Sequence, residues 1–125
     1  MQRYDPLEAP KPEEWLALDE RERIDLARDY HRSAGIRLPN AKVHATVHAM
    51  VETQIALGDE TAARRTAQRL MDAGLDRHEA IHAIGWVLIE FMSDLMETPE
   101  LGTDPNAPYF AALERLTVEH WRRLR

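Results

Sequence analysis

The hydrophobic and polar positions along the chain repeat mainly with the period of an α-helix. At 100° per residue, one narrow stripe in the segment 41–57 holds His44, His48, Val51 and Ile55. A second stripe, in the most apolar segment at 77–97, holds His78, His82, Gly85, Ile89, Met92 and Met96. No alternating run indicates a β-strand. The pattern therefore predicts an all-α fold.

Residues that favour helix ends divide the chain into segments. Four residues suited to a helix start precede predicted helices: Asp19, Asn40, Asp59 and Asp76. Three glycines suited to a helix end follow them: Gly35, Gly58 and Gly74. We predict helices at about 20–33, 41–57, 60–73, 77–97 and 108–123, with an irregular arm at 1–11, a helical turn at 12–17 and a loop at 98–107. Short joints favour antiparallel neighbours, so we expect a compact up-down bundle of four to five helices in a single domain, 1–125.

Composition narrows the functional classes. The net charge of −6 argues against a general nucleic-acid binder, which needs a clustered basic surface. The absence of cysteine excludes disulfides and thiolate metal sites. No apolar run is long enough to span a membrane, and the first residues lack the layout of a signal peptide. We expect a cytoplasmic protein with no nucleic-acid or membrane partner; the oligomeric state stays open.

The candidate chemistry lies in two histidine pairs. His78-Glu79-x-x-His82 places two imidazoles on one helix face, where both can reach a single metal ion. His44-x-x-x-His48 repeats this spacing upstream, and Glu52 follows one turn later. Two such pairs on neighbouring helices indicate a shared site more strongly than either pair alone.

The expected topology brings these pairs together. In an up-down order, the segments 41–57 and 77–97 run parallel, and their N-terminal turns share one end of the bundle. His31 and His120 could reach the same end. A helix N-terminus favours neutral imidazole, the form that binds metal. We predict a site for one divalent transition metal ion. Zinc is the first expectation for this metal, and nickel and iron are the alternatives. The proposed ligands of the ion are His44, His48, His78 and His82, with Glu52 or Glu79 as a further ligand or as a hydrogen-bond partner of the imidazoles.

Several of these residues also have purely structural interpretations. Glu79 stands three residues after Asp76, where a capping box places a glutamate. His31 suits the negative end of a helix. Gly85 would let a neighbouring helix approach, and the methionines of the apolar stripe, Met92 and Met96, would fill the core.

The two motifs resemble a family of small bacterial helical proteins classed as a domain of unknown function. The resemblance covers about residues 38–92 and rests on Leu38-Pro39-Asn40, on His44-x-x-x-His48-x-x-Val51-Glu52-x-Gln54-Ile55 and on the run from Gly74 to Gly85. It implies a single all-helical domain and no particular activity. The matching positions are His44, His48, Glu52, His78, Glu79 and His82.

Two better-known sequence patterns match parts of the motif His78-Glu79-x-x-His82. Zinc peptidases of the His-Glu-x-x-His type would use His78 and His82 as ligands and Glu79 as general base. This chain offers no strand to hold a peptide. Four-helix di-iron proteins use Glu-x-x-His, which Glu79 and His82 match, but the segment 41–57 lacks the second copy.

Three hypotheses follow from the sequence. The first is a helical bundle that binds a divalent metal through the histidine cluster. The second is a metal-dependent hydrolase in which Glu79 activates water. The third is a non-catalytic scaffold whose histidines hydrogen-bond in the core.

Overall fold

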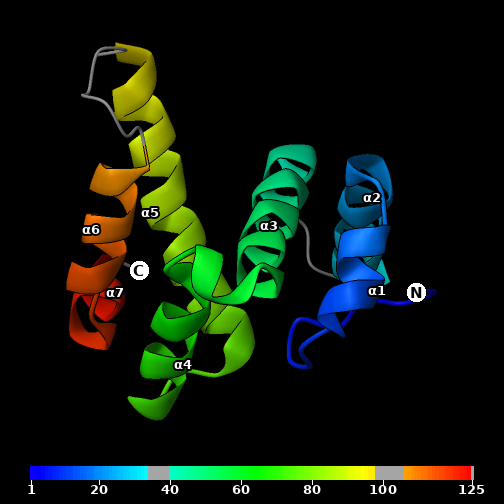
Figure 1. Ribbon diagram of the computed structural model, residues 1–125, viewed down its shortest axis with the longest axis horizontal. Coiled ribbons are helices and arrows are strands. Elements are labelled where there is room, and N and C mark those ends of the chain that lie inside the picture. The colour runs from blue at the N-terminus through cyan, green and yellow to red at the C-terminus, as the bar shows by residue number, and fades with distance from the viewer. Residues whose placement is uncertain (34–39, 98–105, 125) are drawn as a thin grey trace.

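The computed structural model describes residues 1–33, 40–97 and 106–124, and within these ranges every regular element is a helix (Figure 1). The elements are α1 (Pro12–Ala17), α2 (Glu20–Ser33), α3 (Ala41–Ala56), the 3-10 helix η1 (Gly58–Glu60), α4 (Ala63–Asp72), α5 (Arg77–Glu97), α6 (Ala107–Arg115) and α7 (Val118–Leu124). The predicted all-α fold is confirmed. The predicted Gly35 helix end and most of the predicted loop at 98–107 lie outside the described residues.

The helix count of four to five is too low, because the described residues form seven α-helices. The predicted helix at 108–123 is two helices, α6 and α7, since the backbone is extended at Leu116. Thr117 then starts α7 by accepting a hydrogen bond from the backbone N–H of His120 at 3.1 Å. The predicted turn at 12–17 is a helix of its own, α1.

Three of the four predicted helix starts, Asp19, Asn40 and Asp76, act as caps. The prediction for Asp59 is wrong, because it lies inside η1 and α4 begins at Ala63 without a side-chain cap. Asp19 accepts from the N–H of Glu22 at 2.8 Å, and Glu22 accepts from the N–H of Asp19 at 3.1 Å, which is a reciprocal capping box. Asp76 accepts from the N–H of Glu79 at 2.8 Å. The glycines after α3 and α4 adopt positive φ angles of 66° at Gly58 and 115° at Gly74, as a glycine at a helix end commonly does.

The helix directions differ from the expectation in one respect. The expectation that α3 and α5 run parallel is wrong: Glu52, late in α3, pairs with Arg77 at the start of α5, whereas the ring of His44, early in α3, contacts His82. The cause is α4, which has ten residues and cannot return the chain along the sixteen of α3. Helix α5 therefore starts near the C-terminal end of α3 (Figure 1).

The core has two parts, and α3 lies between them (Figure 1). One part lies among the helices from α3 through α7 and includes the buried side chains of Leu70, Ile81, Ile84 and Leu113. The smaller part joins the N-terminal arm, α1, α2 and α3 through Tyr4, Trp15, Ala27, Ala45 and Ala49. Helix α3 contributes to both parts, so His48, which lies between Ala45 and Val51 on this helix, is buried at the boundary.

The C-terminal half of α5 is more exposed than its apolar stripe suggests. Met92 and Met96, expected in the core, are 40% and 84% exposed. The end of α5 extends past α3 in Figure 1, so this part of the stripe has no α3 surface to cover it. None of the helices in the described ranges has the length and apolar character needed to cross a membrane.

Candidate metal centre

Five of the six histidines meet where α2, α3 and α5 come together. His31 comes from the last turn of α2, His44 and His48 from α3, and His78 and His82 from α5. The ring centroids of His78 and His82 lie 4.3 Å apart, and those of His48 and His78 lie 5.1 Å apart. The i, i+4 spacing seen in the sequence thus places both pairs on facing helices.

Four of these side chains lie close enough together that they could hold a metal ion. His31, His48, His78 and His82 each offer a ring nitrogen, and these four nitrogens lie within 4.8 Å of one another. Nitrogens bound to one ion at about 2.0–2.1 Å lie roughly 3.3 Å apart in a tetrahedron. Shortening these separations by up to about 1.5 Å would bring the four imidazoles around one ion.

Three buried ring nitrogens in this cluster lack a hydrogen bond. Among the described residues, the Nε2 atoms of His48, His78 and His82 have no hydrogen-bond partner. Burying a polar atom without a partner costs about 1–3 kcal/mol, and such atoms are rare in folded proteins. These three atoms belong to residues of the four-histidine group, an arrangement compatible with metal binding.

The ring of His31 is oriented by its own helix. Its Nδ1 lies 2.7 Å from the carbonyl oxygen of Ala27, one turn earlier. A carbonyl only accepts, so Nδ1 carries the proton and donates it. The lone pair of His31 is then on Nε2, which lies 3.1 Å from Nε2 of His44.

The ring of His48 is oriented by a chain of polar contacts from the N-terminal arm. The Tyr4 hydroxyl contacts the Glu52 carboxylate and lies 3.0 Å from His48 Nδ1. The carboxylate only accepts, so the hydroxyl donates to Glu52, and its oxygen accepts a hydrogen bond from the Nδ1–H of His48. This fixes the proton of His48 on Nδ1 and leaves Nε2 with a free lone pair. Burial and the charge of Glu52 raise the pKa of Tyr4, which keeps the hydroxyl protonated.

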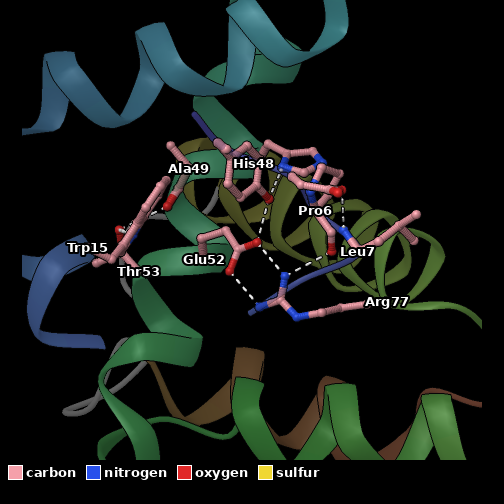
Figure 2. A network of polar contacts seen from close by, with 10 residues as sticks. Pro6, Leu7, Trp15, His48, Ala49, Glu52, Thr53 and Arg77 are labelled. Carbon is pink, nitrogen blue, oxygen red and sulfur yellow. Dashed lines mark hydrogen bonds and ion pairs between the residues drawn. The ribbon is translucent and has the colours of Figure 1, made fainter. Parts of the chain in front are cut away.

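Glu52 is held by Arg77 and is not one of the four residues whose possible ligand atoms cluster together. The two guanidinium nitrogens Nη1 and Nη2 of Arg77 donate to its two carboxylate oxygens at 2.7 Å each, and Nη1 also donates to the carbonyl of Pro6 at 3.0 Å (Figure 2). Both side chains are almost fully buried, and each charge is compensated by the other within the ion pair. Glu52, predicted as a ligand or a hydrogen-bond partner of the imidazoles, is therefore linked to His48 by the hydroxyl of Tyr4, which contacts both side chains.

His44 lies at the edge of the cluster. Its Nε2 is 3.1 Å from Nε2 of His31, and its ring centroid lies 4.9 Å from that of His82. The side chain is half-buried. His44 is outside the group of four nitrogens, in which His31 stands instead.

Burial keeps the cluster neutral. The pKa of His44 is lowered to about 4 by burial and by the neighbouring His31 and His78. The pKa of His82 is lowered to about 3 by burial and by His78, His44 and His31. Burial also lowers the pKa of His48 and of His78. These imidazoles are therefore uncharged at neutral pH and have the lone pairs that metal binding requires.

Two other candidates from the sequence lie elsewhere. The carboxylate of Glu79 accepts from the indole N–H of Trp121 in α7 at 2.6 Å. His120 is exposed, and its ring packs near Trp86, with the two ring centroids 5.9 Å apart, rather than near the other histidines. The break between α6 and α7 changes the course of this segment, so His120 is not brought to the cluster.

Sequence reasoning gave Tyr4 and Arg77 no role, and it interpreted His31 mainly as a helix-end residue. His31 had a usable signal, because the end of α2 must approach the start of α3 across a short joint. Arg77 stands next to His78, but nothing in the spacing pairs it with Glu52. Tyr4 lies in an irregular segment without periodicity, so no sequence pattern indicates its contact with His48.

Comparisons of the chain with family models, with curated proteins and with solved structures gave no match. The resemblance to a family of small helical proteins therefore stays a prediction.

Proposed function

We propose that this helical protein binds one divalent transition metal ion through His31, His48, His78 and His82. Zinc is the first expectation, because four neutral imidazoles around one ion match its tetrahedral preference. Nickel and iron are the alternatives, since both accept imidazole ligands.

The observation that carries this proposal is that three buried Nε2 atoms, in residues of the four-histidine group, have no hydrogen-bond partner among the described residues. One ion would satisfy all three, together with Nε2 of His31. The third sequence hypothesis, a scaffold with hydrogen-bonded core histidines, requires partners for the same atoms. The metal proposal explains them with a single ligand.

The surrounding residues support this ligand set. A histidine that binds a metal through one ring nitrogen usually donates a hydrogen bond from the N–H of the other nitrogen to a carbonyl or to a polar side chain. His31 does so to Ala27, and His48 does so to Tyr4, which Glu52 and Arg77 hold in place. Glu52 then orients a ligand rather than binding the ion. His44, the remaining member of the predicted set, is a neighbour that can donate a hydrogen bond into the site.

The hydrolase alternative depends on Glu79 as general base. Its carboxylate accepts from Trp121, and its backbone N–H is bound by Asp76 at the start of α5. Both contacts favour a structural role in joining α5 to α7. We therefore propose metal binding without assigning Glu79 a reaction.

The test is elemental analysis of protein purified without a histidine tag, followed by measurement of the affinity for zinc. We expect about one metal ion per chain. His48→Gln and His82→Gln should each weaken binding by 100-fold or more, because each removes one of four ligands. His120→Gln is the matched control, since it changes an exposed histidine outside the cluster and should leave affinity unchanged.

Two results would contradict the proposal. The first is protein that carries no metal and gains no thermal stability when zinc is added. The second is zinc binding that His48→Gln and His82→Gln leave as tight as in the unaltered protein, which would place the ion elsewhere.

A further inference from the structure

A cavity of about 240 Å³ adjoins the histidine cluster. Its histidine wall is formed by His44, His48 and His82. The rest of its wall is apolar, and two of the six residues are tryptophans: Val47, Ile81, Gly85, Trp86, Ile89 and Trp121. The cavity thus has one end with nitrogen ligands and a body suited to a hydrophobic group.

The size of the cavity limits its occupant to a small molecule. Apolar cavities of about 150 Å³ hold a benzene molecule. The larger volume here accepts one ring, or a branched chain of similar size, together with a small polar head. Indole walls favour a flat ring, because aromatic rings stack or meet edge to face.

The charge at the histidine end selects the head group. Four neutral imidazoles leave the charge of a divalent ion uncompensated, and none of the described residues lining the cavity has a carboxylate. The carboxylate of Glu52 is already paired with Arg77. The carboxylates of Asp5, Asp76 and Glu79 act on His78, and none of them lines the cavity. An anion arriving through the cavity would supply the missing charge.

His44 adds a second contact for that anion. In the structure, Nε2 of His44 lies 3.1 Å from Nε2 of His31. When His31 Nε2 binds an ion, its lone pair is no longer open to a proton from His44. The N–H of His44, on the cavity wall, is then free to donate to a bound oxygen. Ion and N–H together match the two oxygens of a carboxylate.

We propose that this cavity binds a small carboxylate with an aromatic or compact apolar body, one oxygen on the metal as a fifth ligand beside the four imidazoles and the other on His44. The inference rests on the proposed metal site and adds the class of its ligand. Trp86 and Trp121 contact the apolar body, and Ile89, 48% exposed, borders the outer side of the cavity.

The test uses protein loaded with cobalt(II), whose visible absorption reports changes in its ligands. Cobalt content is measured first, and benzoate, acetate and benzyl alcohol are then titrated separately. We expect benzoate to shift the cobalt bands and to bind at least tenfold more tightly than acetate, which lacks the ring. It should also bind at least tenfold more tightly than benzyl alcohol, which lacks the charge, and metal-free protein should not bind it measurably.

Ile89→Trp fills the outer part of the cavity from a half-exposed position and leaves the histidines in place. It should weaken benzoate binding tenfold or more, while cobalt content and acetate binding stay unchanged. Met92→Trp is the matched control, because Met92 is 40% exposed on the same helix and does not line the cavity. Benzoate should bind to that variant as it does to the unaltered protein.

The outcomes separate this inference from the metal site itself. Cobalt bound one to one, with benzoate no tighter than acetate, would overturn the carboxylate site and leave the metal site standing. Equal benzoate binding by metal-free protein, or by Ile89→Trp, would overturn it as well. Failure of the unaltered protein to bind cobalt would remove both proposals at the first step.

Discussion

Tyr4 decides which nitrogen of His48 is available for an ion. Its hydroxyl must donate to Glu52, so it accepts from Nδ1 of His48 and fixes the proton there. Arg77 in turn holds Glu52 with two hydrogen bonds. A residue of the irregular N-terminal arm thus controls the ligand state of a histidine 44 positions later.

Replacing Tyr4 by phenylalanine should weaken metal binding while the fold persists. The change removes the hydroxyl that orients His48, and losing such a support lowers metal affinity by about 10- to 100-fold. Competition with a chromophoric chelator measures the affinity. Tyr109→Phe is the control, because it removes a hydroxyl bonded to Gln54 at 2.5 Å among the residues of the larger core. Equal zinc affinities for unaltered protein and Tyr4→Phe would contradict this role.

The sequence predicted those site residues whose position follows from helical periodicity. His44, His48, His78 and His82 were found because a spacing of four residues places two side chains on one helix face. His31 replaces His44 among the four converging nitrogens because of how α2 packs on α3, which a spacing within one helix does not encode. Tyr4 approaches His48 only through tertiary folding of the arm.

At the scale of elements, Gly85 sets the distance between α3 and α5. A Cβ atom at this position would lie 3.0 Å from a methyl group of Val47 and 3.9 Å from one of Val51. The predicted role of this glycine, close approach of a neighbouring helix, is confirmed. The same approach brings His44 and His48 against His82.

Gly85→Ala should destabilise the protein although alanine is the better helix former. The helical preference adds roughly 0.5–1 kcal/mol, whereas overpacking against Val47 costs about 1–3 kcal/mol. Urea unfolding of Gly85→Ala, Val47→Ala and the double variant measures the coupling. We expect the glycine substitution to be less harmful, or stabilising, once Val47 is shortened, with a coupling of at least about 0.5 kcal/mol. Strictly additive effects would show that the two side chains do not compete for space.

Most of the helices were predictable from their caps and their hydrophobic periodicity, whereas the relative direction of α3 and α5 was not. Asp19, Gly58 and Gly74 act within a few residues of their own position, so local patterns locate those helix ends. The direction of α5 relative to α3 depends on the length of α4 and on the 3-10 turn before it. These details change where the chain turns without changing its hydrophobic pattern.

At the scale of the molecule, the buried neutral histidines make stability depend on pH. The unfolded chain takes up protons on these rings near pH 6.5, whereas the folded pKa values of His44 and His82 are lowered to about 4 and about 3. The unfolded state therefore binds more protons between these values. The contribution of the neutral rings is fully present above pH 6.5 and is lost as pH falls toward 4 and then 3.

Urea unfolding of metal-free protein at several pH values between 7.5 and 4.5 tests this dependence. The free energy of unfolding should fall with decreasing pH, with a slope of up to about 1.4 kcal/mol per pH unit for each histidine involved. His44→Gln should reduce the slope, and His120→Gln should leave it unchanged. A stability that stays constant, or rises, as the solution is acidified would refute the neutral cluster.

The two-part core has a consequence for how the molecule opens. The smaller core, around Tyr4, Trp15 and Ala27, anchors residues 1–33 to α3 with few buried side chains. Such a unit can detach at a lower free energy than global unfolding requires. The ion would link His31, from this unit, to His78 and His82 of the larger one. Hydrogen exchange of the α2 amides should therefore slow on metal loading far more than that of the α6 amides, because the ion would set the local opening equilibrium of residues 1–33.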